Sequence, residues 1–164
     1  MHPPVAVNTF GDRKEMKHLR TWYVVADGGR ARILQKREGQ HSFDTRREFV
    51  SADIHRHTHE LGVERPGRTH ESANSARHAV EPRQDLHRAE KQNFVDEVAS
   101  ALNEANTRDE FDRLVLVAPA HALGELNRAL DAPTQRKIVA QLQKDLTNVP
   151  NADLAKHFTD LSQV

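Results

Sequence analysis

The sequence predicts a single α/β domain in which helices pack against a mixed β-sheet. The chain has 164 residues, a length typical of one domain. Short apolar runs rich in β-branched and aromatic residues occupy its first third and return near residues 113–118, a pattern typical of strands. The second half adds apolar residues at helical spacing, so the early strands are followed by alternating helices and strands.

The first predicted elements are an antiparallel hairpin and a third strand. Residues 22–26 form an aromatic and β-branched run, typical of a strand buried on both faces. Residues 31–35 repeat this pattern after an Asp-Gly-Gly-Arg turn at 27–30, where glycine can take a positive φ. A polar turn around 38–40 then leads to a weaker strand near 47–51.

A flexible N-terminal extension is expected over residues 1–20, and the folded domain over residues 21–164. Within this domain, residues 54–83 contain few large apolar side chains. Such a stretch buries little surface, so we expect a long polar loop about 54–83. Long loops on rigid scaffolds often carry function, which makes this segment the first place to look for a site.

One long amphipathic helix is predicted over residues 83–106, with Pro82 at its first position. The most apolar run, residues 113–118, predicts a central strand covered on both faces. Pro119 ends that strand and opens a second helix. The inward-facing residues of this helix are expected to be Leu123, Leu126 and Leu130.

The last third contains one ambiguous segment. Residues 131–133 predict a turn, and the spacing over residues 135–146 fits either a helix or an edge strand. Asn151 is a plausible N-cap for a last helix. Three early strands joined to a later strand–helix unit predict a mixed sheet with helices packed on it.

Composition excludes several classes of function. Lysine plus arginine equals aspartate plus glutamate at 24 each, so no overall positive charge attracts nucleic acid or an anionic membrane. Cysteine is absent, which excludes disulfides, thiolate metal sites and thiol nucleophiles. The chain has neither an apolar run long enough to span a membrane nor an export signal at its charged start. We expect a cytoplasmic protein without a membrane partner, and the oligomeric state stays open.

Histidine is unusually frequent, with 11 in the chain and six between residues 55 and 87. His55, His57 and His59 alternate with other residues, so on an extended backbone their imidazoles share one face and can bind one divalent metal ion. The flanking residues are polar, and a solvated histidine-rich loop is the alternative that we favour. No other cofactor is expected.

Arginines in the same loop form a candidate phosphate site. Arg65 and Arg68 flank a Pro-Gly turn that contains Gly67, and Arg77 follows later in the sequence. Guanidinium groups can bind phosphates in a bidentate manner. Interleaved glutamates cancel most of this charge, so an internally paired loop is the alternative. The glycines at 27–30 could also hold a phosphate, but no helix follows them, and a hairpin turn is the better interpretation.

Polar residues also gather where the loop meets the predicted helix. Glu81 and Asp85 lie near its first turn, where Glu81 can cap backbone N–H groups and His78 can pair with a carboxylate. His87 and Glu90 are three residues apart and therefore neighbours on a helix. An acid–base pair is conceivable there. No nucleophile lies beside it in the sequence, so we favour structural capping and pairing.

Several short motifs occur in a fixed order along the chain: WYVVADGGRARI at 22–33, ARHAVEP at 76–82 after Gly67 and Arg68, LVLVAP at 114–119 and KDLT at 144–147. In this combination the chain resembles the bacterial host-attachment family, often described as proteins required for attachment to host cells. The resemblance covers about residues 21–162.

This family is similar to the middle domain of archaeal and eukaryotic class 1 peptide release factors. The resemblance implies a mixed sheet like that of ribonuclease H, a long loop before the major helix, and a strand over residues 139–146. In release factors that loop carries Gly-Gly-Gln and triggers hydrolysis of peptidyl-tRNA. Here no Gly-Gly pair and no glutamine lie between Arg56 and Arg83, so release chemistry is not expected.

The function that follows is a non-catalytic cytoplasmic module that binds the ribosome or structured RNA. Its contacts with phosphates and sugars would come from Arg65, Gly67, Arg68, Arg77 and His78. One alternative is an attachment-related factor that binds a protein partner and no RNA. The other is a metal-dependent hydrolase with His55, His57 and His59 as its ligands.

Overall fold

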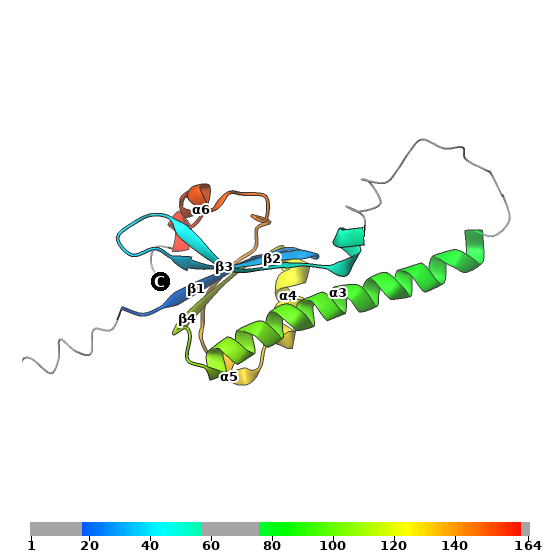
Figure 1. The fold of residues 1–164 in the computed structure, drawn as a ribbon, viewed down its shortest axis with the longest axis horizontal. Helices are drawn as coiled ribbons and strands as arrows, with labels where there is room; N and C mark the ends of the chain where they lie inside the picture. The colour runs from blue at the N-terminus through cyan, green and yellow to red at the C-terminus, as the bar shows by residue number, and fades with distance from the viewer. Residues whose placement is uncertain (1–17, 57–75, 162–164) are drawn as a thin grey trace, which may run out of the picture.

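The computed structural model describes residues 18–56 and 76–161, and its centre is a five-stranded sheet (Figure 1). The strands are β1 (Thr21–Ala26), β2 (Arg30–Lys36), β3 (Phe43–Val50), β4 (Arg113–Val117) and β5 (Ile138–Leu142). Their order in the sheet is β3-β2-β1-β4-β5. β1 pairs antiparallel with β2, and β2 with β3, whereas β1, β4 and β5 run parallel. The predicted α/β class with a mixed sheet is confirmed.

Helices lie on both faces of the sheet (Figure 1). One face is covered by the long α3 (Ala76–Thr107) and by α4 (Ala120–Ala129), with the single-turn α5 (Ala132–Gln135) next to them. The other face is covered by α6 (Asn151–His157) and the short η1 (Thr159–Leu161). Residues 52–56, which follow β3, are also helical.

The larger part of the core lies between the sheet and α3 with α4. Trp22, Val24 and Ala26 of β1 point to this side because side chains alternate along a strand. Phe111, which precedes β4, is fully buried beside Trp22, with ring centroids 5.0 Å apart. The apolar stripe that α3 contributes consists of Phe94, Val95, Val98, Ala99, Leu102 and Ala105.

A smaller cluster fills the opposite face of the sheet, under α6. Tyr23 of β1 stacks on Phe158 with ring centroids 5.3 Å apart. Phe43 of β3 meets both rings edge-on, at 5.0 and 5.4 Å. Val25 and Leu34 complete the sheet's contribution near this aromatic group. The sheet is therefore buried on two sides.

The long helix α3 has two unlike parts. From Phe94 onward it packs its apolar stripe on the sheet, whereas residues 83–93 contribute no side chain to the core clusters. Leu86 in this part is 49% exposed. A helix of 32 residues is about 48 Å long, and Figure 1 shows α3 extending well past the sheet. We call residues 83–93 the α3 arm.

Several predicted elements are confirmed. The β1–β2 hairpin and the fully covered strand β4 are present, and Leu123, Leu126 and Leu130 are buried. A strand is present where the resemblance implied one, but it spans Ile138–Leu142 and does not extend to residue 146. The third strand extends over Phe43–Val50, earlier than the range expected near 47–51.

The start of α3 differs from the prediction. The helix begins at Ala76 and continues through Pro82, so the expected start at residue 83 is wrong. The helix propensity of the Ala, Arg and Glu residues before Pro82 outweighs the preference of proline for the first turn of a helix. Both ends of the loop expected over residues 54–83 are helical, since residues 52–56 and the residues from Ala76 onward lie in helices, and residues 57–75 lie outside the described residues.

Asn151 does not cap the last helix. Pro150 occupies the N-cap position of α6, and Asn151 is the first helical residue. Its side chain is bound elsewhere: Oδ1 accepts from Arg32 Nη1 at 2.8 Å, and Nδ2 donates to Thr45 Oγ1 at 2.7 Å. The expected extension over residues 1–20 lies outside the described residues except for 18–20.

Candidate functional site

The carboxyl ends of β1, β4 and β5 meet at one edge of the sheet because these strands are parallel. In α/β proteins ligands bind at such an edge. The turn at 27–30 follows β1 there, and Ser51 follows β3. The Ser51 N–H donates to the Gly29 carbonyl at 2.8 Å, which joins the turn to the helical residues 52–56.

The 27–30 turn is closed by its own aspartate. Asp27 Oδ1 accepts hydrogen bonds from the N–H groups of Gly29 at 2.7 Å and Arg30 at 2.6 Å. Asp27 Oδ2 accepts from the Thr147 hydroxyl at 3.0 Å. The amides of Gly29 and Arg30 are therefore already bound, and the antiparallel pairing of β1 with β2 confirms the hairpin-turn interpretation.

Gly29 is required at this turn for space. Among the described residues, the only glycine with a positive φ is Gly39, so the positive φ expected at residues 27–30 is wrong. A Cβ on Gly29 would lie 2.4 Å from Ile54 Cδ1 and 3.1 Å from Ser51 Oγ. The absent side chain lets Ile54 pack directly on the turn, which fixes the position of residues 52–56.

We expect Gly29→Ala to lower the free energy of unfolding by about 1–3 kcal/mol because the new methyl overlaps Ile54. Chemical denaturation measures this loss. Ile54→Val removes the overlapping Cδ1 atom, so the double variant should lose less stability than the sum of the two single variants. Gly28→Ala is the matched control, since nothing lies within 4 Å of a Cβ there. Additive effects of Gly29→Ala and Ile54→Val would contradict the proposed contact.

A cluster of four polar side chains connects residues 52–56 to the α3 arm. We call Asp53, Arg56, His87 and Glu90 the junction cluster. His87 Nδ1 lies 3.1 Å from Asp53 Oδ2. Arg56 Nη2 donates to Glu90 Oε1 and lies 3.9 Å from Asp53 Oδ1. The segment 57–75 begins and ends at the two elements that this cluster joins.

The carboxylates of the junction cluster are its most buried groups. The Glu90 side chain is 12% exposed and the Asp53 side chain 25% exposed, whereas Arg56 and His87 are about half exposed. Glu90 Oε2 is fully buried and has no hydrogen-bond partner among the described residues. Ligand atoms of Asp53, His87 and Glu90 all lie within 4.8 Å of one another.

The structure includes only part of the predicted site residues. His87 and Glu90 are neighbours, as predicted, while Asp85 is exposed and lies outside the cluster. His55 is exposed on a helical segment, so the extended backbone assumed for the three histidines is wrong at this position. Because α3 begins at Ala76, Glu81 is not at the helix start, where a cap would lie.

The remaining predicted residues are not described at side-chain level. Arg77 and His78 lie on the first turns of α3, where only the backbone is described. The others lie outside the described residues: His57, His59, Arg65, Gly67 and Arg68. Their roles stay predictions.

Sequence reasoning missed Asp53 and Arg56. The sequence does contain a signal for them, namely Ser51, because serine is a favoured N-cap residue. In the structure the Ser51 hydroxyl accepts a hydrogen bond from the Ile54 N–H at 3.3 Å, as an N-cap serine does. A serine before Ala-Asp predicts a helix start there, and a helix at 52–56 places Asp53 and Arg56 on one side.

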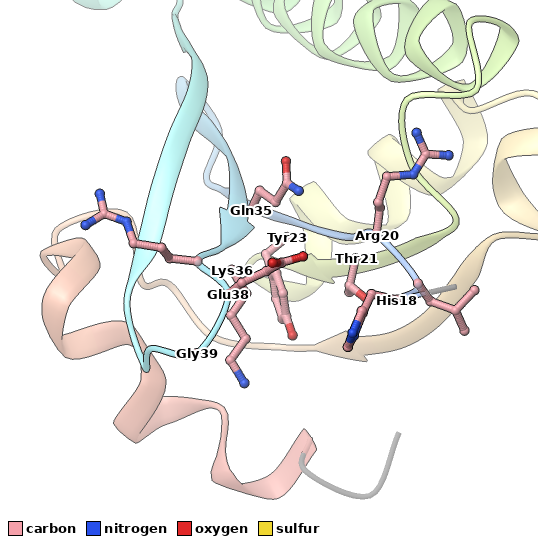
Figure 2. A pocket seen from close by; sticks show the side chains of 10 residues that line it. His18, Arg20, Thr21, Tyr23, Gln35, Lys36, Glu38 and Gly39 are labelled. Carbon is pink, nitrogen blue, oxygen red and sulfur yellow. The ribbon is translucent and has the colours of Figure 1, made fainter. Parts of the chain in front are cut away.

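A pocket of about 530 Å³ lies at the opposite edge of the sheet, where β1 begins and β2 ends (Figure 2). Two of its cations are already paired. Arg20 Nε donates to Asp112 at 3.1 Å, and Arg37 bonds Asp44. These hydrogen bonds raise the pKa of both guanidinium groups and lower the pKa of both carboxyls. Figure 2 shows Arg20 pointing away from Lys36 and Tyr23.

None of the described residues that line this pocket is a predicted site residue. Tyr23 lines it, and burial raises the pKa of the Tyr23 hydroxyl. The pocket therefore combines a neutral phenol with the two paired guanidinium groups and with the side chains of Lys36 and Glu38. In the part of the chain that the structure describes, no helix has both the length and the apolar character to cross a bilayer.

Fold and site together define a single α/β domain with a mixed sheet. Its long helix α3 packs on the sheet and is linked to residues 52–56 by a polar cluster. The sequence model for "protein required for attachment to host cells" matches residues 22–158. The chain belongs to this family, and the resemblance found in the sequence is confirmed. A comparison with curated proteins found no match.

Similar solved structures include the crystal structure of archaeal translation termination factor aRF1, with a TM-score of 0.46 and 10% identity. That match covers 88% of this chain and 39% of the other. Another is described as an archaeal protein, with a TM-score of 0.45, 10% identity, and coverage of 94% and 41%. The chain thus spans about two fifths of the length of both.

Proposed function

We propose that this protein is a non-catalytic binding module that acts in the cytoplasm on the ribosome or on structured RNA. The observation that carries the proposal is the α3 arm, a helical extension past the sheet that contributes no side chain to the apolar core (Figure 1). A helix that is polar on all sides contributes little to a core. Its exposure suits contact with a large partner better than enclosure of a small ligand.

The arm connects the folded sheet to the segment with the candidate phosphate-binding residues. The first residue of α3 lies about 20 Å along the helix from Glu90 of the junction cluster. Arg77 is on this first turn, and Arg65 and Arg68 precede it in the sequence. A partner that contacts these arginines would meet the module at the end of the arm.

The local charge of the arm supports a phosphate-bearing partner. Three cationic residues of the arm are exposed, namely Arg83, Arg88 and Lys91. The arm contains two carboxylates of opposite charge, those of Asp85 and Glu90. Glu90 is already bound by Arg56. The arm is therefore positive although the chain as a whole is neutral, and phosphate contacts are the main source of affinity for RNA.

Sedimentation of cell lysate through a sucrose gradient tests this proposal. The protein should be found in ribosomal fractions at low salt and shift to the top as salt rises. A variant with Arg65, Arg68 and Arg77 changed to Glu should stay at the top. The charge-matched control changes Arg108, Arg128 and Arg136, exposed at a distance from the arm, to Glu.

Two outcomes would contradict the proposal. Wild-type protein at the top of the gradient in low salt would exclude a ribosomal partner. Equal displacement of the test and control variants would show that binding depends on overall charge and not on the end of the arm.

The family description favours a second candidate, an attachment-related factor that binds a protein partner without RNA. The same gradient separates the two functions. Sedimentation at the top, together with loss of host attachment after deletion of the gene, would support the protein partner.

A further inference from the structure

We propose that the junction cluster binds one divalent transition-metal ion, with Asp53, His87 and Glu90 as its ligands. This inference is independent of the proposed function. It also differs from the metal site predicted at His55, His57 and His59, since it uses none of those residues.

The geometry of the three side chains suits a single ion. Their ligand atoms lie within 4.8 Å of one another. The 3.1 Å between His87 Nδ1 and Asp53 Oδ2 is close to the roughly 3.3 Å that separates two ligands of a tetrahedral zinc ion. His87 and Glu90 come from one face of α3, and Asp53 comes from residues 52–56. Metal binding would therefore fasten the two elements together.

Burial and charge favour a cation at this position. The side chains of Asp53 and Glu90 are 25% and 12% exposed, and the guanidinium of Arg56 contacts both of their carboxylates. Glu90 Oε2 is buried without a hydrogen-bond partner among the described residues, which is costly for a carboxylate oxygen. A divalent ion would supply the missing contact.

The ligand types indicate which ion is preferred. Two carboxylates and one imidazole suit zinc or manganese, whereas magnesium and calcium prefer oxygen ligands alone. Three protein ligands leave a fourth position for water. We therefore expect Zn²⁺ to bind more tightly than Mg²⁺.

Arg56 occupies the place that the ion would take. Its guanidinium contacts both carboxylates, but its side chain is 49% exposed and can turn toward solvent. Arginine and metal should therefore compete for the same oxygens. Removing Arg56 should strengthen metal binding, whereas removing a ligand should weaken it. A salt-bridge cluster without a metal site would not show these opposite effects.

Zinc titration of the full chain in competition with a chromophoric chelator tests the proposal, after dialysis against EDTA. Wild-type protein should bind one Zn²⁺ with higher affinity than any further ions. Glu90→Gln and His87→Ala should each weaken this site at least about tenfold, and Arg56→Gln should tighten it several-fold. His121→Ala is the matched control, since His121 is 86% exposed beside Glu125 on α4 and should leave the site unchanged.

A further variant tests whether the predicted histidine ligands account for the zinc binding, because exposed histidines bind zinc on their own. Changing His55, His57 and His59 together to Ala should leave the tight site intact. Loss of the site in this variant, with retention in Glu90→Gln, would overturn the proposal, and so would the absence of a saturable site in wild-type protein. Circular dichroism without metal checks folding. If His87→Ala does not fold, Glu90→Gln, which keeps the shape of the side chain, decides the question.

Discussion

Replacing Arg32 with methionine is expected to lower the free energy of unfolding by about 2–4 kcal/mol, because its guanidinium holds the C-terminal segment to the sheet. Nη1 donates to Asn151 Oδ1 at 2.8 Å. Nη2 donates to the carbonyl oxygens of Leu146 at 3.1 Å and Val149 at 2.8 Å. Methionine keeps the apolar stem of the side chain and leaves the three acceptors without their donor.

The loss should be concentrated in one part of the molecule. Residues 143–158 cover the smaller core cluster, so their detachment exposes Val25, Leu34 and Phe43. Relative to the wild-type protein, amide hydrogen exchange in Arg32→Met should accelerate more in α6 than in β1. Chemical denaturation gives the total loss in the free energy of unfolding. Arg30→Met is the matched control, since Arg30 is exposed on the same strand and should change stability by less than about 0.5 kcal/mol. Unchanged protection of α6 in Arg32→Met would show that the hydrogen bonds do not hold the segment.

Phe111→Ala should be the most damaging single truncation that we describe, at about 3–5 kcal/mol. The ring has no exposure to solvent, lies 5.0 Å from the Trp22 ring and is contacted by the Lys137 ammonium at 5.1 Å. Alanine leaves a cavity where β4, β1 and the end of α3 converge. Trp22 is the only tryptophan of the chain and is 4% exposed, so its fluorescence reports unfolding at the affected place.

Phe111→Leu separates volume from aromatic character. It keeps most of the buried volume and should cost less than about 1.5 kcal/mol. If leucine and alanine destabilise the protein equally, ring contacts matter at this position more than the filling of space.

The predictable parts of the fold are those in which a pattern repeats within one element. β4 is an unbroken apolar run, and α4 places leucines at helical spacing, so both can be recognised without knowledge of the rest of the chain. β5 is harder because it is a half-exposed edge strand of five residues, whose pattern also fits a helix. Only the family resemblance favoured a strand there.

The candidate site could be predicted only in half. His87 and Glu90 are neighbours through helical spacing, which the sequence contains. Their partners Asp53 and Arg56 come from a separate helical turn, and Arg56 is 34 residues from Glu90 along the chain. Arg32 is similar, because its acceptors are 114 to 119 residues away. Pairing over such separations depends on the packed fold and leaves no local pattern.

The two parts of α3 imply two different opening reactions within one helix. Beyond Phe94, breaking the helix exposes the core, so amide exchange there should follow global unfolding. In the α3 arm, the interactions among the described residues that oppose opening are local helix propensity and the junction cluster, so the amides of the arm should exchange through smaller openings. Ligands that act at the cluster would shift the population of the ordered arm and leave the sheet at its own stability. Order at one end of this protein can thus be regulated separately from the stability of its core.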